Sequence, residues 1–230
     1  MDLSVVVPAY NEEENIVKLL TELSKVLERQ SLEYEVIIVN DNSTDGSKKL
    51  LDGLREKYPH LKPIHRTPPR GVGHTLRRGF SEASGNIIVT MDADLSHHPE
   101  DIPRLLAKLS EGFDIVLGSR YIEGGGMENT ILRKIISRGF SVFSRLLGLT
   151  VSDATTGFRA HKKEVLAKLN LSSTGFEIHI EIPMKAAKYG FKIGEVPIKY
   201  HERHAGESKL DYKKEGPRYV KVALKTALGK

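Results

Sequence analysis

The sequence contains no cysteine and no tryptophan, and aromatic residues make up only 7% of its 230 residues. Without thiols the chain forms no disulfide, and cysteine zinc sites, iron–sulfur clusters and thiol nucleophiles are excluded. The sequence also lacks a stretch of about 18 uncharged apolar residues, which a membrane-spanning helix requires. Met1 leads directly into the apolar run LSVVV with no basic segment before it. We therefore expect neither a membrane span nor a signal peptide.

What is present is typical of a globular protein: 39% of the residues are hydrophobic and 28% are charged. This composition excludes a disordered, collagen-like or coiled-coil chain. The net charge of +5 lies entirely in residues 199–230, which hold nine Lys or Arg and four Asp or Glu. A basic end on a neutral body predicts an anionic partner such as phosphate, a membrane surface or nucleic acid, and a solvated basic tail is the alternative.

Apolar runs alternate with helical patterns through the first half of the chain. We predict strands at 3–7, 34–39, 61–65, 86–91 and 114–117. Helices are predicted at 11–29, at 43–58, from the end of a Pro/Gly loop at 68–73 to about residue 84, and at 99–111. Asn11 is the expected cap of the first helix. Near-continuous apolar strands separated by helices predict an α/β fold, Rossmann-like and doubly wound around a mainly parallel sheet. The length suits one domain over residues 1–230.

Polar clusters follow the ends of four of these strands. They are Tyr10–Glu12, Asp41, Asp92 with Asp94, and Arg120. Ligands of open parallel sheets bind at the carboxyl ends of the strands. The shared position of the four clusters therefore predicts a ligand site there.

The triplet Asp92-Ala93-Asp94 is the sharpest of these features. Two carboxylates just past a strand can share a divalent cation, and Mg²⁺ is held by one or two carboxylates plus substrate phosphates. The alternative is a turn with two solvated aspartates. Asp41 could accept hydrogen bonds from a ribose or base. We predict no zinc site, because the nine histidines lack further ligands at zinc-like spacing.

Two further segments have alternative interpretations. Arg70-Gly71-Val72-Gly73 could bring backbone N–H groups and a cation to phosphate, or could be a plain turn. Residues 130–149 form an amphipathic pattern with four basic and no acidic residues, typical of a helix in a membrane interface or of one packed on the body. After the break Gly124-Gly125-Gly126 we also expect a helix at 176–189, a strand at 192–200 and a basic helix at 212–228.

Several longer stretches together resemble family-2 glycosyltransferases of GT-A fold, and more closely the dolichyl-phosphate (polyprenyl-phosphate) β-mannosyltransferases. They are VVVPAYNEEENI (5–16), VIIVNDNSTDGS (36–47), MDADLSHHPE (91–100), GSRY (118–121), DATTGFRAHKKEVL (153–166), GFEIHIEI (175–182) and KIGEVPIKYHERHAGESKL (192–210). The resemblance implies a nucleotide-sugar-binding half at 1–120, an acceptor-side half at 121–211 with the amphipathic helix, and a basic C-terminal helix at 212–230.

The resemblance also implies roles for single residues. The nucleotide sugar would be held by Pro8, Ala9, Tyr10, Glu12, Val39, Asp41, Asp92, Ala93, Asp94, Arg120, Arg203 and Lys209. Asp94, Arg120, Arg133 and Arg203 would act in catalysis, and Asp92, Asp94 and, weakly, Ser96 would bind Mg²⁺ or Mn²⁺. Some relatives have Gln at the position of Ser96, and Asn40 stands where an acid is frequent.

The implied activity is inverting transfer of mannose from GDP-mannose to dolichyl or polyprenyl phosphate. The implied location is peripheral, on the cytoplasmic face of the endoplasmic reticulum or plasma membrane, with a small membrane subunit as a candidate partner. Many relatives carry transmembrane helices, so this sequence represents a shortened chain, a soluble form or a subunit that needs a membrane partner. Three alternatives stay open: UDP-glucose or another donor, a hydroxyl acceptor, and a non-catalytic nucleotide-sugar-binding subunit. Nucleic acid is not expected, because pI 9.2 is its only support.

Overall fold

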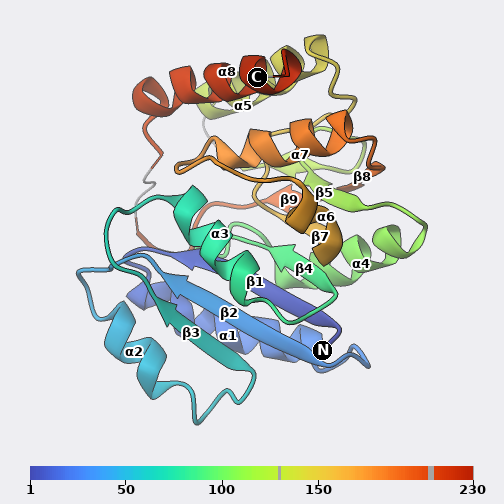
Figure 1. The fold of residues 1–230 in the computed structure, drawn as a ribbon. Helices are drawn as coiled ribbons and strands as arrows, with labels where there is room; N and C mark the ends of the chain where they lie inside the picture. The colour runs from blue at the N-terminus through green and yellow to red at the C-terminus, as the bar shows by residue number, and fades with distance from the viewer. Residues whose placement is uncertain (129–130, 207–209, 230) are drawn as a thin grey trace.

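The structure is a computed structural model that describes residues 1–128, 131–206 and 210–229, without the side chain of residue 133. A seven-stranded sheet runs through the middle of the molecule, with helices on both faces (Figure 1). Its strands, in spatial order, are β3 (Leu61–His65), β2 (Tyr34–Asn40), β1 (Leu3–Ala9), β4 (Ile87–Thr90), β7 (Arg159–Lys162), β5 (Ile115–Ser119) and β8 (Ile193–Pro197). The predicted doubly wound, mainly parallel α/β fold is confirmed, because only β7 runs antiparallel to its neighbours.

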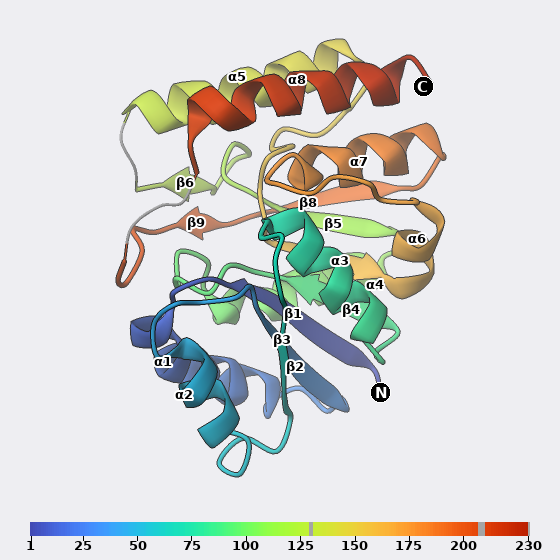
Figure 2. The ribbon, with the colours of Figure 1, turned by 60° about the vertical axis from the view of Figure 1, so that its left-hand side comes forward.

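The described chain also forms helices, which flank the sheet or lie beyond it (Figure 1). They are α1 (Glu13–Leu27), α2 (Ser47–Gly53), α3 (Val72–Glu82), α4 (Ile102–Ser110), α5 (Ile131–Leu146), α6 (Lys163–Lys168), α7 (Ile178–Lys188) and α8 (Tyr212–Ala227), with a 3₁₀ turn at Pro99–Asp101. A second, two-stranded sheet pairs β6 (Gly126–Met127) with β9 (Lys199–Tyr200). In Figure 2, α5 and α8 lie side by side along the edge of the molecule beyond α7.

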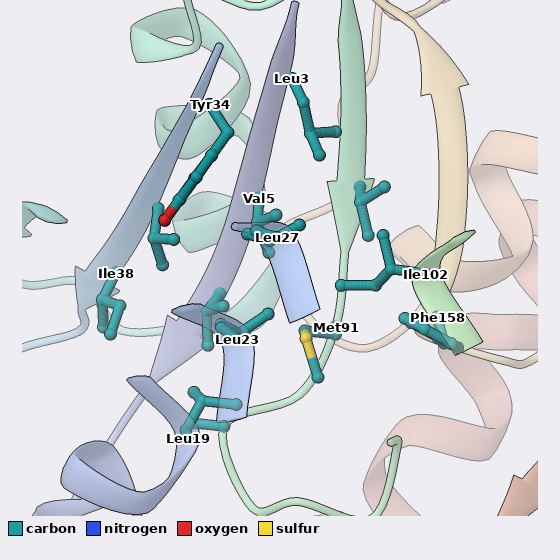
Figure 3. Packing of buried hydrophobic residues seen from close by; sticks show 14 of the residues in the cluster. Leu3, Val5, Leu19, Leu23, Leu27, Tyr34, Ile38, Met91, Ile102 and Phe158 are labelled. Atoms are coloured by element: carbon teal, nitrogen blue, oxygen red, sulfur yellow. The ribbon is translucent and has the colours of Figure 1, made fainter. Parts of the chain in front are cut away.

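Successive residues of β1 point to opposite faces of the sheet, and each face has its own core. Val5 and Val7 pack with α1, α2 and α4, and Figure 3 shows Leu19, Leu23 and Leu27 of α1 on this side. Val6 packs on the other side with residues of α3, α6 and α7. Fully burying one such aliphatic side chain stabilises the fold by about 1.5–3 kcal/mol, so the two cores hold the strand ends in place.

The first loop differs from the prediction. Asn11 does not cap α1: its φ is 54°, and its Oδ1 accepts a hydrogen bond from the Thr44 backbone N–H at 2.8 Å. The second helix was predicted to begin at Ser43 but begins at Ser47, because the preceding polar residues bind the 11–13 turn instead. Ser43 Oγ accepts from Asn11 N at 2.9 Å, and Asp45 Oδ2 accepts from Glu13 N at 3.2 Å. These bonds join the loops that follow β1 and β2.

Four elements were absent from the prediction or divided differently. The polar segment RAHK forms β7 between β4 and β5, and α6 follows it directly. The strand predicted at 192–200 is split into β8 and β9, which belong to different sheets. The predicted helix at 43–58 also ends early, at Gly53. A polar strand in the interior has no hydrophobic periodicity, so sequence patterning does not indicate it.

Candidate active site

A cavity of about 820 Å³ lies at the carboxyl ends of β1, β2, β4 and β5. It collects most of the predicted nucleotide-sugar residues: Pro8, Ala9, Tyr10, Glu12, Asp41, Asp92, Ala93, Asp94, Arg120 and Arg203. Val39 and Ser96 are fully buried and do not line it. Lys209 and the side chain of Arg133 lie outside the described residues, so their roles stay predictions.

Asp94 lines this cavity and forms an ion pair with Arg203. Its Oδ2 is 2.9 Å from Nη2 of Arg203, which comes from the segment after β9. Its Oδ1 accepts hydrogen bonds from the Ser96 hydroxyl at 2.5 Å and the Ser96 backbone N–H at 3.0 Å. Ser96 therefore orients Asp94, and its predicted weak metal role is not tested by this geometry.

Asp92 is the more accessible carboxylate, with its side chain 37% exposed. Desolvation and the negative charge of Asp94 raise the pKa of Asp92 to about 7. His97 lies 3.7 Å away but provides no opposing charge, because burial lowers the pKa of His97 to about 4. The His97 ring stacks on Phe158 with centroids 5.2 Å apart. The charges of Arg203 and Arg120 oppose the rise in the Asp92 pKa but do not cancel it.

This donor set fits a divalent cation. A cation between the carboxylates would remove the repulsion that now favours a proton on Asp92. Within the described residues, no group of three or more His, Asp or Glu is placed to hold a metal. The protein thus offers two carboxylates, and phosphate oxygens of a substrate would supply other ligands, as is common for Mg²⁺.

Arg120 is held by a carboxylate that sequence reasoning did not single out. Its Nε and Nη2 donate to the two oxygens of Asp153 at 2.6 and 2.7 Å, and Nη2 also reaches Thr155 at 2.8 Å. Burial opposes the charge on Arg120, but the Asp153 carboxylate outweighs this and raises the Arg120 pKa. The guanidinium therefore stays charged at the cavity wall. The only signal for Asp153 was its place at the start of the DATTGFR stretch.

The opposite end of the cavity is built around Asp41. Its Oδ1 accepts from Arg66, and its Oδ2 accepts from the Gly71 backbone N–H at 2.7 Å. The Arg70 guanidinium lies over the Tyr10 ring, 4.6 Å from its centroid. A planar base would find here a ring surface beside hydrogen-bonding groups.

The Arg70–Gly73 segment is a structural turn with no free amide for phosphate at Gly71 or Gly73. The N–H groups of Gly73 and His74 both point to the Thr174 carbonyl, at 3.1 and 3.3 Å. A Cβ on Gly73 would lie 2.5 Å from the Ser173 carbonyl oxygen, so the close approach requires glycine. Of the two interpretations, the geometry favours the plain turn.

The cavity also contains residues without a predicted role. Tyr200, Tyr219, His179 and Gly157 all line it, and a Cβ on Gly157 would lie 3.2 Å from Asp92 Oδ1. Burial raises the pKa of Tyr200 to about 12, so its phenol is neutral. Gly157, His179 and Tyr200 fall within stretches that resemble the family. Gly157 and His179 follow no predicted strand, and Tyr200 is the last residue of the strand predicted at 192–200, where no role was assigned to it.

Comparison with known proteins decides the family. The model of the family described as "Glycosyl transferase family 2" matches residues 4–169. The chain belongs to glycosyltransferase family 2. It is 42% identical over 214 residues to a dolichol-phosphate mannosyltransferase of Pyrococcus furiosus, covering 91% of this chain and 59% of that relative. The glycosyltransferase thus spans little more than half the length of this relative.

A second relative is the polyprenol monophosphomannose synthase of Mycolicibacterium smegmatis, which is 36% identical over 220 residues, covering 90% of this chain and 80% of the relative. Among solved structures, the fold matches glucosyl-3-phosphoglycerate synthase from Mycobacterium tuberculosis in complex with Mn²⁺, UDP and glucosyl-3-phosphoglycerate. The TM-score is 0.74 at 24% identity, covering 99% of this chain and 80% of that one. The similarity supports a GT-A fold for this glycosyltransferase.

Proposed function

We propose that this glycosyltransferase moves mannose from GDP-mannose to the phosphate of dolichol or another polyprenol and inverts the anomeric centre. The observation that carries the proposal is the convergence of Asp92, Asp94, Arg120 and Arg203 in one cavity. Two carboxylates suit a metal-bound diphosphate, and two guanidiniums suit phosphate groups. The names of the mannosyltransferase relatives support the choice of sugar and acceptor.

In this reaction an oxygen of the acceptor phosphate attacks the anomeric carbon of mannose from the face opposite GDP. The bond from that carbon to the diphosphate oxygen breaks, and GDP leaves with the electron pair. When bound, Mg²⁺ or Mn²⁺ supplies Lewis-acid stabilisation of the leaving diphosphate. Asp92 and Asp94 would hold the cation, and Arg203 and Arg120 would stabilise negative charge on the phosphates. A phosphate acceptor is ionised near neutral pH, so the site needs no strong general base.

The geometry of α5 supports a membrane as the place of reaction. Ile131, Ile135 and Leu146 are 75%, 64% and 81% exposed, an unusual set of aliphatic side chains for one helix. The helix also carries Lys134, Arg138 and Arg145, and cations beside exposed apolar residues suit an anionic lipid surface. No helix in the described part of the chain is long and apolar enough to cross a bilayer. We propose peripheral binding on the cytoplasmic face.

The decisive experiment is transfer of labelled sugar to a short polyprenyl phosphate in detergent. GDP-mannose and UDP-glucose are compared, each with Mg²⁺, with Mn²⁺ or with excess EDTA. We expect an acid-labile mannolipid from GDP-mannose, lost in EDTA and restored by added metal. Transfer from UDP-glucose alone would overturn the donor. If the folded protein binds GDP but transfers neither sugar, we would conclude that the reaction requires a membrane subunit or a different acceptor. Absence of nucleotide binding would overturn the function.

A further inference from the structure

The six residues after β9, His201–Gly206, form a strap across the loop that carries the carboxylate pair. Backbone hydrogen bonds attach the strap to that loop. His201 N–H donates to the Ser96 carbonyl and His204 N–H to the Asp94 carbonyl, both at 2.9 Å. Between them, Arg203 contacts Asp94 with its guanidinium at 2.9 Å. The position of the strap therefore determines where Arg203 lies in the cavity.

The other side of the strap is attached to α1 at two points. The side-chain amide of Asn15 donates to the Ala205 carbonyl at 3.3 Å. One turn along the helix, Lys18 Nζ lies 3.3 Å from His204 Nδ1, in an exposed contact. The two attachments differ in burial, because Asn15 is only 1% exposed. An exposed contact between long side chains contributes little, so Asn15 is the firmer of the two.

The same Asn15 nitrogen also donates to Oε2 of Glu12, at 2.6 Å. An amide NH₂ has two hydrogens, and here they serve two acceptors from different parts of the chain. Glu12 lines the cavity beside Asp92 and Asp94, whereas Ala205 belongs to the strap. Asn15 thereby connects the donor side of the cavity to the segment that carries Arg203.

Placing an amide at this position is costly. Asn15 lies in the first turn of α1, and its neighbour Ile16 faces the core. The Oδ1 atom of Asn15 is buried and has no hydrogen-bond partner among the described residues. A buried acceptor left unpaired destabilises the folded state, and a leucine of similar size would avoid this cost. The contribution of the amide is thus the two bonds that it donates.

We propose that Asn15 is a positioning residue: its amide fixes the strap His201–Gly206 against Glu12 and thereby holds Arg203 over Asp94. The inference rests on the proposed function for its catalytic consequence but not for its structural one. Arg203 stabilises charge on the departing diphosphate only when the guanidinium is placed correctly. Without Asn15, the exposed Lys18–His204 contact is the one attachment of the strap to α1 that remains among the described residues. The backbone bonds to Ser96 and Asp94 then hold the strap from one side, and we expect Arg203 to leave its position over Asp94 more often.

The first test needs no substrate. Hydrogen–deuterium exchange of the whole protein reports the His201 and His204 amides, which the strap keeps bonded to the Asp94–Ser96 loop. We expect Asn15→Leu to speed exchange of the strap about tenfold or more, while the core strands β1 and β2 keep their protection. The matched control is Lys18→Met, which should change strap exchange less than twofold. Unchanged strap exchange in Asn15→Leu would overturn the proposal.

The second test uses transfer from GDP-mannose in a double-mutant cycle with Arg203. We expect Asn15→Leu to lower kcat about tenfold in the unaltered protein, but less than twofold when Arg203 is already Ala. A role confined to folding would lower kcat by the same factor in both backgrounds, and that additivity would overturn the proposal. Failure of the proposed function is distinct, because the unaltered enzyme would then transfer no mannose while the exchange test still decides the role of Asn15.

Discussion

Arg120 and Asp153 form a buried, bidentate ion pair at the wall of the cavity. Two guanidinium nitrogens reach the two carboxylate oxygens at 2.6 and 2.7 Å, and the Arg120 backbone N–H donates to the same carboxylate at 3.0 Å. The Asp153 side chain is fully buried. Burial opposes the charge of Asp153, but the Arg120 charge and hydrogen bonds outweigh it and lower the Asp153 pKa. Asp153 therefore fixes both the charge and the direction of Arg120.

Replacing Asp153 by Asn should destabilise the protein by about 3–5 kcal/mol, because it leaves a buried guanidinium without its counter-charge. Urea unfolding measures this loss. The double variant Arg120→Met with Asp153→Leu should recover much of the stability, because it leaves no unpaired charge, yet it should not recover mannosyl transfer. If the double variant is as active as the parent, Arg120 has no role in the reaction.

Asp92→Asn and Asp94→Asn should each lower turnover at least a hundredfold, because each removes a charged ligand of the cation that holds the donor diphosphate. Asp92→Asn should also raise the melting temperature in EDTA, since it removes a carboxylate whose pKa is raised to about 7 by desolvation and, next, by the charge of Asp94. Transfer assays and thermal unfolding of the same preparations check both effects. Near-normal turnover in both variants would refute the metal role of this pair.

His161 predicts a dependence of stability on pH. It lies fully buried in β7, and both ring nitrogens lack a partner among the described residues. Burial, and then the charge of Arg159, hold the pKa of His161 well below 6.5. Below about pH 6.5 the His161 ring takes up a proton in the unfolded chain but stays neutral in the folded chain. The free energy of unfolding therefore falls as the pH falls.

We expect His161→Leu to reduce this acid sensitivity by up to about 1.4 kcal/mol per pH unit below pH 6.5 and to have little effect above pH 7.5. The free energy of unfolding in urea, measured between pH 5 and 8, gives the comparison. Identical slopes for parent and variant would show that His161 is protonated in the folded protein.

The exposed face of α5 predicts lipid binding. Changing Ile131, Ile135 and Leu146 to Ser should weaken flotation with anionic liposomes about tenfold or more, since each aliphatic side chain stabilises its apolar contact by roughly 1.5–3 kcal/mol when fully buried. Val17→Ser on α1, at a position 39% exposed, is the control and should bind like the parent. Equal flotation of the triple variant would show that α5 does not contact the membrane.

The sequence alone determined the strands β1, β2 and β3 and the placement of Asp41, Asp92 and Asp94 after strand ends. These features follow from local patterns: apolar runs that two layers of helices must cover, and polar residues at the first positions where the chain leaves the sheet. The same local logic predicted the amphipathic helix α5, whose exposed face the structure confirms.

The tertiary structure alone decided which distant segments meet at the site. β7 enters the sheet antiparallel between β4 and β5, and this brings Asp153 and Gly157 to Arg120 and Asp92. The strap after β9 returns across the sheet to place Arg203 on Asp94. Local periodicity reports which face of an element is buried but not which element covers it. Strand order and long-range hydrogen bonds carry that information, and they exist only once the chain has folded.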